Sequence, residues 1–332
     1  MSELRWHPVL EEWVITATQR QDRTFFPPPD YNPLAPTKPG GFPTEVPAAD
    51  FDIVVFENKF PSLRREPPAP AVEATPLSPV APAQGICEVV VYTPDAAATL
   101  ATLPVGKIEN LIHVWTDRYV ELGKRDFIQF VYIFENKGRE IGVTLVHPHG
   151  QIYAYPFVPP RIQTELAACE RHQEAHGVNL LEGVRDQEIS DGRRLVLENE
   201  HFVAFIPFFA RSPYETWVLP KAPRRSLADF GPGEPHALAE LLKALLTKFD
   251  NLFGFSLPYI MCMHQAPTDG KNYDHYLWHI EFYPPHRTKD KLKYLAGSEA
   301  GAGAFINDTL AEEKAAELRD REPKGTQPPS SS

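Results

Sequence analysis

The sequence predicts an α+β protein in which two similar halves join into one extended, mainly antiparallel sheet with helices packed on it. The first observation is an order of elements, namely two strands, one long helix and two strands, that occurs twice along the chain. The second is that each half contains one long amphipathic helix. The third is that short turns connect neighbouring strands, which favours antiparallel pairing. No flexible linker separates the halves, and we divide the chain into residues 1–176 and 177–332.

The elements of the first half begin with a hairpin at residues 5–16, where apolar residues alternate. Residues 26–47 and 66–84 are rich in proline, so we expect irregular or extended surface segments there. Apolar residues recur at helical spacing over 106–123. The remaining predictions for this half are strands at 51–57, 88–93, 127–134 and 144–153, and a helix at 161–176.

The second half begins with a polar stretch, residues 177–195, which we interpret as a connector. Leucines and phenylalanines at helical spacing predict a helix over 236–253. The strands predicted around this helix are 201–206, 215–219, 259–263 and 276–282.

Composition excludes several classes of protein. The chain has 332 residues, 42% of them apolar and 23% charged, as in ordinary globular proteins. A net charge of −11 argues against broad nucleic-acid binding. The longest apolar runs are far too short to span a bilayer, and the amino terminus has no apolar signal core. The 3 cysteines are scattered and predict no disulfide framework, so we expect a cytoplasmic protein.

One motif, His147-Pro148-His149-Gly150-Gln151, carries the chemistry. Read as a strand, it places His147, His149 and Gln151 on one face. An imidazole beside an amide suits attack on phosphorus, with His149 as nucleophile and Gln151 bonding a phosphoryl oxygen. The alternatives are a pair of metal ligands or a histidine that is only hydrogen-bonded in the core.

This motif follows Phe134-Glu135-Asn136-Lys137-Gly138, and together the two runs resemble the galactose-1-phosphate uridylyltransferase branch of the histidine-triad superfamily. The resemblance covers residues 5–320 and implies two histidine-triad-like halves in a homodimer with shared active sites. It implies that a covalent uridylyl-His149 exchanges the hexose 1-phosphates of a UDP-sugar, with Gln151 in the third triad position. A nucleotide-sugar phosphorylase on the same scaffold and a non-catalytic nucleotide-binding protein are the alternatives.

The resemblance also implies two metal sites and no organic cofactor. The first would be a zinc site, but its expected cysteines fall on Asn32 and Ala35 and its strand-following histidine on Ala96. One imidazole, that of His147, cannot hold four-coordinate zinc, so we expect no metal there and a packing or hydrogen-bonding role for His147 in the substrate site. The second site would hold one zinc or iron ion through Glu165, His264, His279 and Glu281. The alternative is that His279 and Glu281 pair with each other or with Arg287.

The substrate-binding residues are implied by the same resemblance. Arg20 and Arg23 match a pair that reaches a nucleotide phosphate in the neighbouring subunit, and forked guanidinium groups suit that task. The nucleotide itself would contact Asn58, Lys59, Asn136 and Thr144.

The hexose 1-phosphate is expected on a segment near the carboxyl terminus, at Lys293, Tyr294, Ser298 and Glu299. A glutamine that would donate to the sugar phosphate falls on Phe305 instead. We therefore expect a neighbour such as Asn307 to replace this contact, or the contact to be missing. No nucleic acid or membrane partner is expected.

Overall fold

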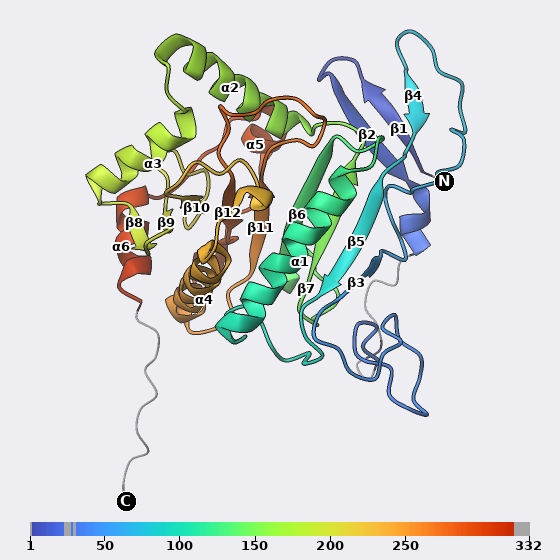
Figure 1. Ribbon diagram of the computed structural model, residues 1–332, viewed down its shortest axis with the longest axis horizontal. Coiled ribbons are helices and arrows are strands. Elements are labelled where there is room, and N and C mark those ends of the chain that lie inside the picture. Colours follow the sequence, from blue (N-terminus) through green and yellow to red (C-terminus); the bar gives the residue numbers. More distant parts are fainter. Residues whose placement is uncertain (1, 23–27, 29–30, 322–332) are drawn as a thin grey trace, which may run out of the picture.

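The computed structural model describes residues 2–22, 28 and 31–321, and its centre is a single antiparallel sheet (Figure 1). Nine strands form this sheet. In their order across it they are β3 (Val54–Glu57), β5 (Ile86–Val91), β7 (His149–Tyr155), β6 (Phe130–Lys137), β11 (Tyr259–His264), β12 (His279–Tyr283), β10 (Thr216–Pro220), β9 (Phe202–Phe205) and β8 (Leu195–Glu198).

The sheet has the internal symmetry that the repeated element order predicts. From the edge inward the first half contributes β3, β5, β7 and β6, and the second contributes the matching strands β9, β10, β12 and β11, with β8 as an additional strand at its outer edge. The halves meet where β6 pairs with β11, for example through Ile133 and Met263. One continuous sheet therefore spans both halves, and the predicted fold class is confirmed.

One long helix from each half covers the same face of the sheet (Figure 1). These helices are α1 (Val105–Gly123) and α4 (Glu234–Phe253), and they pack against each other. Their apolar stripes are buried against the strands, since an amphipathic helix is stable only when that stripe is covered. The buried residues of α1 are Ile108, Leu111, Ile112, Trp115, Tyr119 and Leu122, as the spacing predicts.

The helices α2 (Pro160–His176) and α3 (Leu180–Asp191) contribute to a second core. That core contains Trp217 and Phe205, which lie outside the core beneath α1 and α4. The prediction of a connector over 177–195 is wrong, because this stretch forms α3 and the start of β8. Asn179 caps α3 by accepting hydrogen bonds from two backbone N–H groups, and Gly192 ends it with a left-handed φ of 71°.

Smaller elements surround this frame. β1 (Ser2–His7), β2 (Glu12–Ala17) and β4 (Val80–Pro82) form a separate sheet, which confirms the predicted hairpin. The others are β13 (His286–Thr288), β14 (Lys291–Leu292), α5 (Gly297–Ala302), α6 (Ala311–Arg319) and the 3-10 turns Thr18–Asp22, Arg139–Ile141 and Leu227–Asp229. Within the described residues, no helix combines the length and apolar character needed to cross a membrane.

Candidate active site

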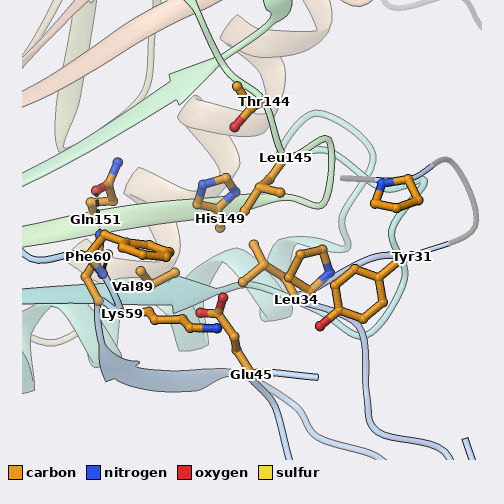
Figure 2. Close-up of a pocket in the computed structure, with 13 residues that line it drawn as sticks. Tyr31, Leu34, Glu45, Lys59, Phe60, Val89, Thr144, Leu145, His149 and Gln151 are labelled. Atoms are coloured by element: carbon orange, nitrogen blue, oxygen red, sulfur yellow. Dashed lines mark hydrogen bonds between the residues drawn. The ribbon is translucent and has the colours of Figure 1, made fainter. Parts of the chain in front are cut away.

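The strand β7 begins at His149, and the backbone just before it fixes the state of the imidazole. His149 Nδ1 lies 2.7 Å from the carbonyl oxygen of His147. A carbonyl can only accept, so the ring proton resides on Nδ1 and the lone pair of the neutral imidazole on Nε2. Strand alternation places Gln151 on the same face, and Figure 2 shows both side chains along the wall of one cavity.

The opposite side of β7 requires a glycine between these two residues. A Cβ at Gly150 would lie 2.2 Å from the hydroxyl oxygen of Tyr92, which leaves no room for a larger side chain. That hydroxyl donates to Glu135 over 3.2 Å, and the hydroxyl of Tyr259 donates to the same carboxyl over 3.1 Å. Burial raises the pKa of Glu135 to about 7, against the opposing effects of Lys137 and the two tyrosines. An ionisable group thus lies beneath the strand that carries His149.

His147 does not share the strand face with His149 and Gln151, and that prediction is wrong. The strand starts at His149, five residues later than the predicted start at Thr144, since Thr144–Pro148 are irregular and Pro148 has no N–H for the ladder. His147 is 2% exposed, with Nε2 at 2.7 Å from the carbonyl of Thr93 and Nδ1 at 2.9 Å from Asn32 Nδ2. Burial lowers the pKa of His147, which favours the neutral ring. Both ring nitrogens take part in hydrogen bonds, and the absence of zinc here stays a prediction.

A cavity of about 210 Å³ opens in front of His149 and Gln151 (Figure 2). The predicted residues Asn58, Lys59 and Thr144 line it, and Asn58 Nδ2 lies 3.4 Å from Gln151 Oε1. The sequence did not single out the other lining residues, which include Phe60, Tyr31, Leu34 and Glu45.

A second cavity, of about 370 Å³, also reaches His149. Asn136 lines this cavity and not the first one, beside Lys137, Arg139 and His147. His149 is therefore part of the walls of two neighbouring cavities, one rich in nucleotide-site candidates and one with two cationic side chains.

Arg20 is not among the described residues that line the first cavity of its own chain, but it contacts Phe60 in the wall of that cavity. Its Nη1 donates to the carbonyl of Phe60 over 3.2 Å and to Ser62 Oγ over 3.0 Å, and it lies 3.4 Å from the hydroxyl of Tyr153. Tyr153 in turn lies 3.4 Å from Gln151 Oε1. Arg23, the other predicted phosphate-binding arginine, lies outside the described residues.

The four predicted metal ligands come together in a buried cluster. Their ligand atoms all lie within 4.8 Å of one another. His264 bridges two carboxylates, with Nδ1 at 2.9 Å from Glu165 and Nε2 at 3.4 Å from Glu281. His279 Nε2 and Glu281 Oε1 are buried and have no hydrogen-bond partner among the described residues. These two buried atoms belong to the same four-residue cluster and lack a hydrogen-bond partner within the described part of the chain. A metal ion bound by the cluster would satisfy both of them.

Further groups contact this cluster that the sequence reasoning missed. Arg161 donates to Glu281 over 2.6 Å and to Glu165 over 3.2 Å, and the hydroxyl of Tyr276 donates to Glu165 over 2.8 Å. The hydroxyl of Tyr283 donates to Glu281. Burial alone would lower the pKa of Arg161, but Glu281, Tyr283 and Glu165 together raise it. Arg161 thus compensates part of the negative charge of two buried carboxylates.

The predicted hexose 1-phosphate residues lie together on the carboxyl-terminal segment. Lys293 Nζ lies 2.7 Å from Glu299 Oε1, and both side chains are largely buried. Ser298 Oγ donates to the carbonyl of Ala304 over 2.7 Å, whereas Tyr294 is 72% exposed. Among the described residues that line the two cavities beside His149, none comes from this segment.

Comparison with known proteins agrees with this architecture. Residues 1–159 match the model of the galactose-1-phosphate uridyl transferase N-terminal domain, and residues 165–326 match that of its C-terminal domain. A solved structure described as that of a uridylyltransferase superposes with a TM-score of 0.85 at 34% identity, covering 96% of this chain and 97% of that one. An ADP-glucose phosphorylase from Arabidopsis thaliana superposes with a TM-score of 0.71 over 97% of this chain and 99% of that one, and its 23% identity shows a shared fold alone.

Curated relatives extend over nearly the whole chain. The galactose-1-phosphate uridylyltransferase of Thermotoga maritima is 40% identical over 324 residues, which cover 97% of this chain and 99% of that protein. That of Haemophilus influenzae is 34% identical over 95% of this chain and 93% of its own length. With full-length identity at this level and both domain models matched in order, the chain belongs to the galactose-1-phosphate uridyl transferase family.

Proposed function

We propose that this protein is a galactose-1-phosphate uridylyltransferase of galactose metabolism, which converts UDP-glucose and galactose 1-phosphate into glucose 1-phosphate and UDP-galactose. The observation that carries the mechanism is the imidazole of His149. Its proton is fixed on Nδ1 by the carbonyl of His147, so Nε2 holds the lone pair where two cavities meet. Membership of the family supports the reaction, and the geometry supports the residue that performs it.

The first half-reaction forms a covalent intermediate. Nε2 of His149 attacks the α-phosphorus of UDP-glucose, a nitrogen–phosphorus bond forms, and the bond to the β-phosphate oxygen breaks as glucose 1-phosphate leaves. A phosphate leaving group needs no proton, so the neutral amide of Gln151 can stand where an acid would otherwise be required. Gln151 and Thr144 would hydrogen-bond the phosphoryl oxygens as charge develops on them. Galactose 1-phosphate then attacks the same phosphorus and releases His149.

The nucleotide would occupy the first cavity. Asn58 and Lys59 offer polar contacts to the ribose and base, and the ring of Phe60 offers an apolar face beside them. Asn136, in the second cavity, would contact the phosphoryl group from the other side of His149.

We infer that the cluster of Glu165, His264, His279 and Glu281 holds one zinc or ferrous ion per chain. Two imidazoles and two carboxylates are a donor set that suits either metal. The metal would join α2 to β11 and β12 and so stabilise the fold. His147 would remain a hydrogen-bonding residue that positions the nucleophile.

We infer further that two chains form a homodimer with shared active sites, the commonest closed assembly. The segment with Lys293, Tyr294, Ser298 and Glu299 lines neither cavity of its own chain, which supports a site completed by a second copy. Arg20 and Arg23 would act on a nucleotide phosphate in the same shared site. All 3 cysteines are buried and unpaired, which supports a reducing, cytoplasmic location.

The experiment is to mix the protein with UDP-glucose labelled at the α-phosphate, in the absence of an acceptor. The parent should retain label that is released by acid and resists base, as a phosphorus–nitrogen bond does. His149→Asn should retain none, whereas His113→Asn, on the exposed side of α1, should label as the parent does.

Labelling of the His149→Asn variant would refute the mechanism. A second measurement decides between acceptors, since only a hexose 1-phosphate can use sugar contacts toward the transition state. Faster discharge of the adduct by inorganic phosphate than by galactose 1-phosphate would replace the transferase assignment with that of a phosphorylase.

A further inference from the structure

The segment that is expected to hold the hexose 1-phosphate has a charge deficit. A sugar phosphate carries a charge of about −2 at neutral pH, like other phosphate monoesters. Lys293, the cation predicted to meet it, already pairs with Glu299 over 2.7 Å. This pair has no net charge. A phosphate dianion on this segment therefore needs another cation.

Asn307, the neighbour that the sequence suggested as a replacement donor, is already engaged. Its Nδ2 donates to the carbonyl of Ala210 over 2.9 Å. Its Oδ1 accepts from the backbone and the hydroxyl of Thr309, at 3.1 and 2.8 Å. The amide thus joins its own segment to Ala210 and to Thr309 through hydrogen bonds. A contact with phosphate would require some of these bonds to break.

Arg211 lies against Phe305, the residue that replaces the expected donor. The central carbon of its guanidinium lies 4.8 Å from the centre of the Phe305 ring, within range of a cation–π contact. One Nη2–H donates to the hydroxyl of Tyr283 over 3.0 Å. Two aromatic groups thus hold the planar guanidinium in place, while the ring of Phe305 remains 42% exposed to solvent.

The charge of Arg211 opposes the rise that burial causes in the pKa of Glu215, but its guanidinium makes no direct ion pair with that carboxyl. No ion pair of Arg211 occurs within the described residues, whereas Arg287 of the same region pairs with Asp308 over 2.6 Å. Glu215 accepts from the backbone N–H of Arg211 and from the indole of Trp217, and not from the guanidinium. The side chain therefore keeps N–H donors in a fork that matches the geometry of phosphate oxygens.

We propose that Arg211, held on the ring of Phe305, binds the phosphate of the hexose 1-phosphate in place of the missing amide. This inference rests on the proposed function and deepens it, because it names a residue that selects sugar phosphates at the same site. The sugar phosphate is both the acceptor and the leaving half of the nucleotide sugar. Arg211 then contributes to the binding of both hexose substrates and leaves nucleotide binding alone.

The test compares Arg211→Gln and Arg211→Lys with the control Arg287→Gln in the full-length protein. In calorimetry, Arg211→Gln should weaken the binding of galactose 1-phosphate by about 10- to 100-fold, the usual effect of losing hydrogen bonds to a charged group. Arg211→Lys should fall between it and the parent, because lysine keeps the charge and loses the fork. Binding of UMP, metal content and melting temperature should stay as in the parent, and Arg287→Gln should bind galactose 1-phosphate normally.

Unchanged binding of galactose 1-phosphate by Arg211→Gln would overturn the proposal. So would an equal loss of UMP binding or a loss of metal, since Arg211 would then act only through Tyr283 and the fold. The labelling of His149 with UDP-glucose tests the proposed function separately from the role of Arg211. A parent that binds galactose 1-phosphate through Arg211 but forms no adduct would refute the transferase and leave Arg211 as a phosphate-binding residue.

Discussion

The buried carboxyl of Glu135 leads to a quantitative expectation for stability. Its pKa lies at about 7 in the folded protein, against an ordinary value of 4.5, because burial disfavours the charged form. Between these two values the folded state binds more protons than the unfolded state, so stability falls as the pH rises from 4.5 to about 7. A shift of this size corresponds to about 3 kcal/mol in the free energy of unfolding. Glu135→Gln removes the ionisation and keeps the shape of the side chain.

Urea unfolding of the parent and of Glu135→Gln at pH 5 and pH 8 tests this expectation. The free energy of unfolding of the parent, relative to the variant, should fall by about 2.5 kcal/mol between the two pH values, slightly less than the full shift because the unfolded carboxyl is already mostly ionised at pH 5. The control is Glu140→Gln, which replaces an exposed carboxyl that lines the second cavity, as Glu135 does. Its free energy of unfolding should change with pH as that of the parent does. If Glu135→Gln and the parent keep a constant difference at both pH values, Glu135 is not protonated in the folded protein and the argument from burial fails.

Three other changes have expected outcomes. Gly150→Ala should lower both thermal stability and adduct formation, because the new Cβ would meet the hydroxyl of Tyr92 at 2.2 Å; adding Tyr92→Phe should recover part of both, and no recovery would place the strain elsewhere. Asn179→Ala should lower the free energy of unfolding by about 1 kcal/mol in urea, as the loss of a helix cap does, and an unchanged value would mean that water replaces the cap. Chelation should lower the melting temperature of the parent but not of Glu165→Ala, whereas equal effects on both would exclude Glu165 as a ligand.

The two long helices could be predicted because their signal is local. Every buried residue of α1 follows the 3.6-residue period, so the pattern predicts the face as well as the element. The same reasoning fails for α3, where Arg185 and Glu188 are buried. Arg185 donates to the carbonyl of Pro220 over 3.0 Å, and Glu188 pairs with Arg194 over 2.6 Å. Charged residues that are buried through distant partners look like a solvated surface in the sequence.

The residues of the candidate site likewise fall into those that the sequence could identify and those that it could not. His149 and Gln151 could be identified as site candidates because their motif lies on one strand, and the proposed metal ligands because each matches a family position. The position of His147 could not be predicted from the sequence, because it depends on where β7 begins and on a contact with Asn32, which is distant in the chain. Arg161 had a usable signal, its place one helical turn before Glu165, but its contact with Glu281 joins residues 120 positions apart.

The duplicated halves hold two imidazoles in one backbone arrangement, and we propose a different chemistry for each. β7 begins at His149 and β12 at His279, and in each ring Nδ1 contacts the carbonyl two residues earlier, at 2.7 and 3.0 Å. This contact places the proton on Nδ1 and the lone pair on Nε2 in both rings. What differs is the surroundings of Nε2. His149 lines two cavities, whereas His279 is 1% exposed, and its Nε2 faces Glu281 Oε1 at 3.7 Å. We infer that the surroundings of Nε2 direct the first lone pair to phosphorus, in an open cavity, and the second to a metal, among three further ligands, with no change in how either imidazole is held.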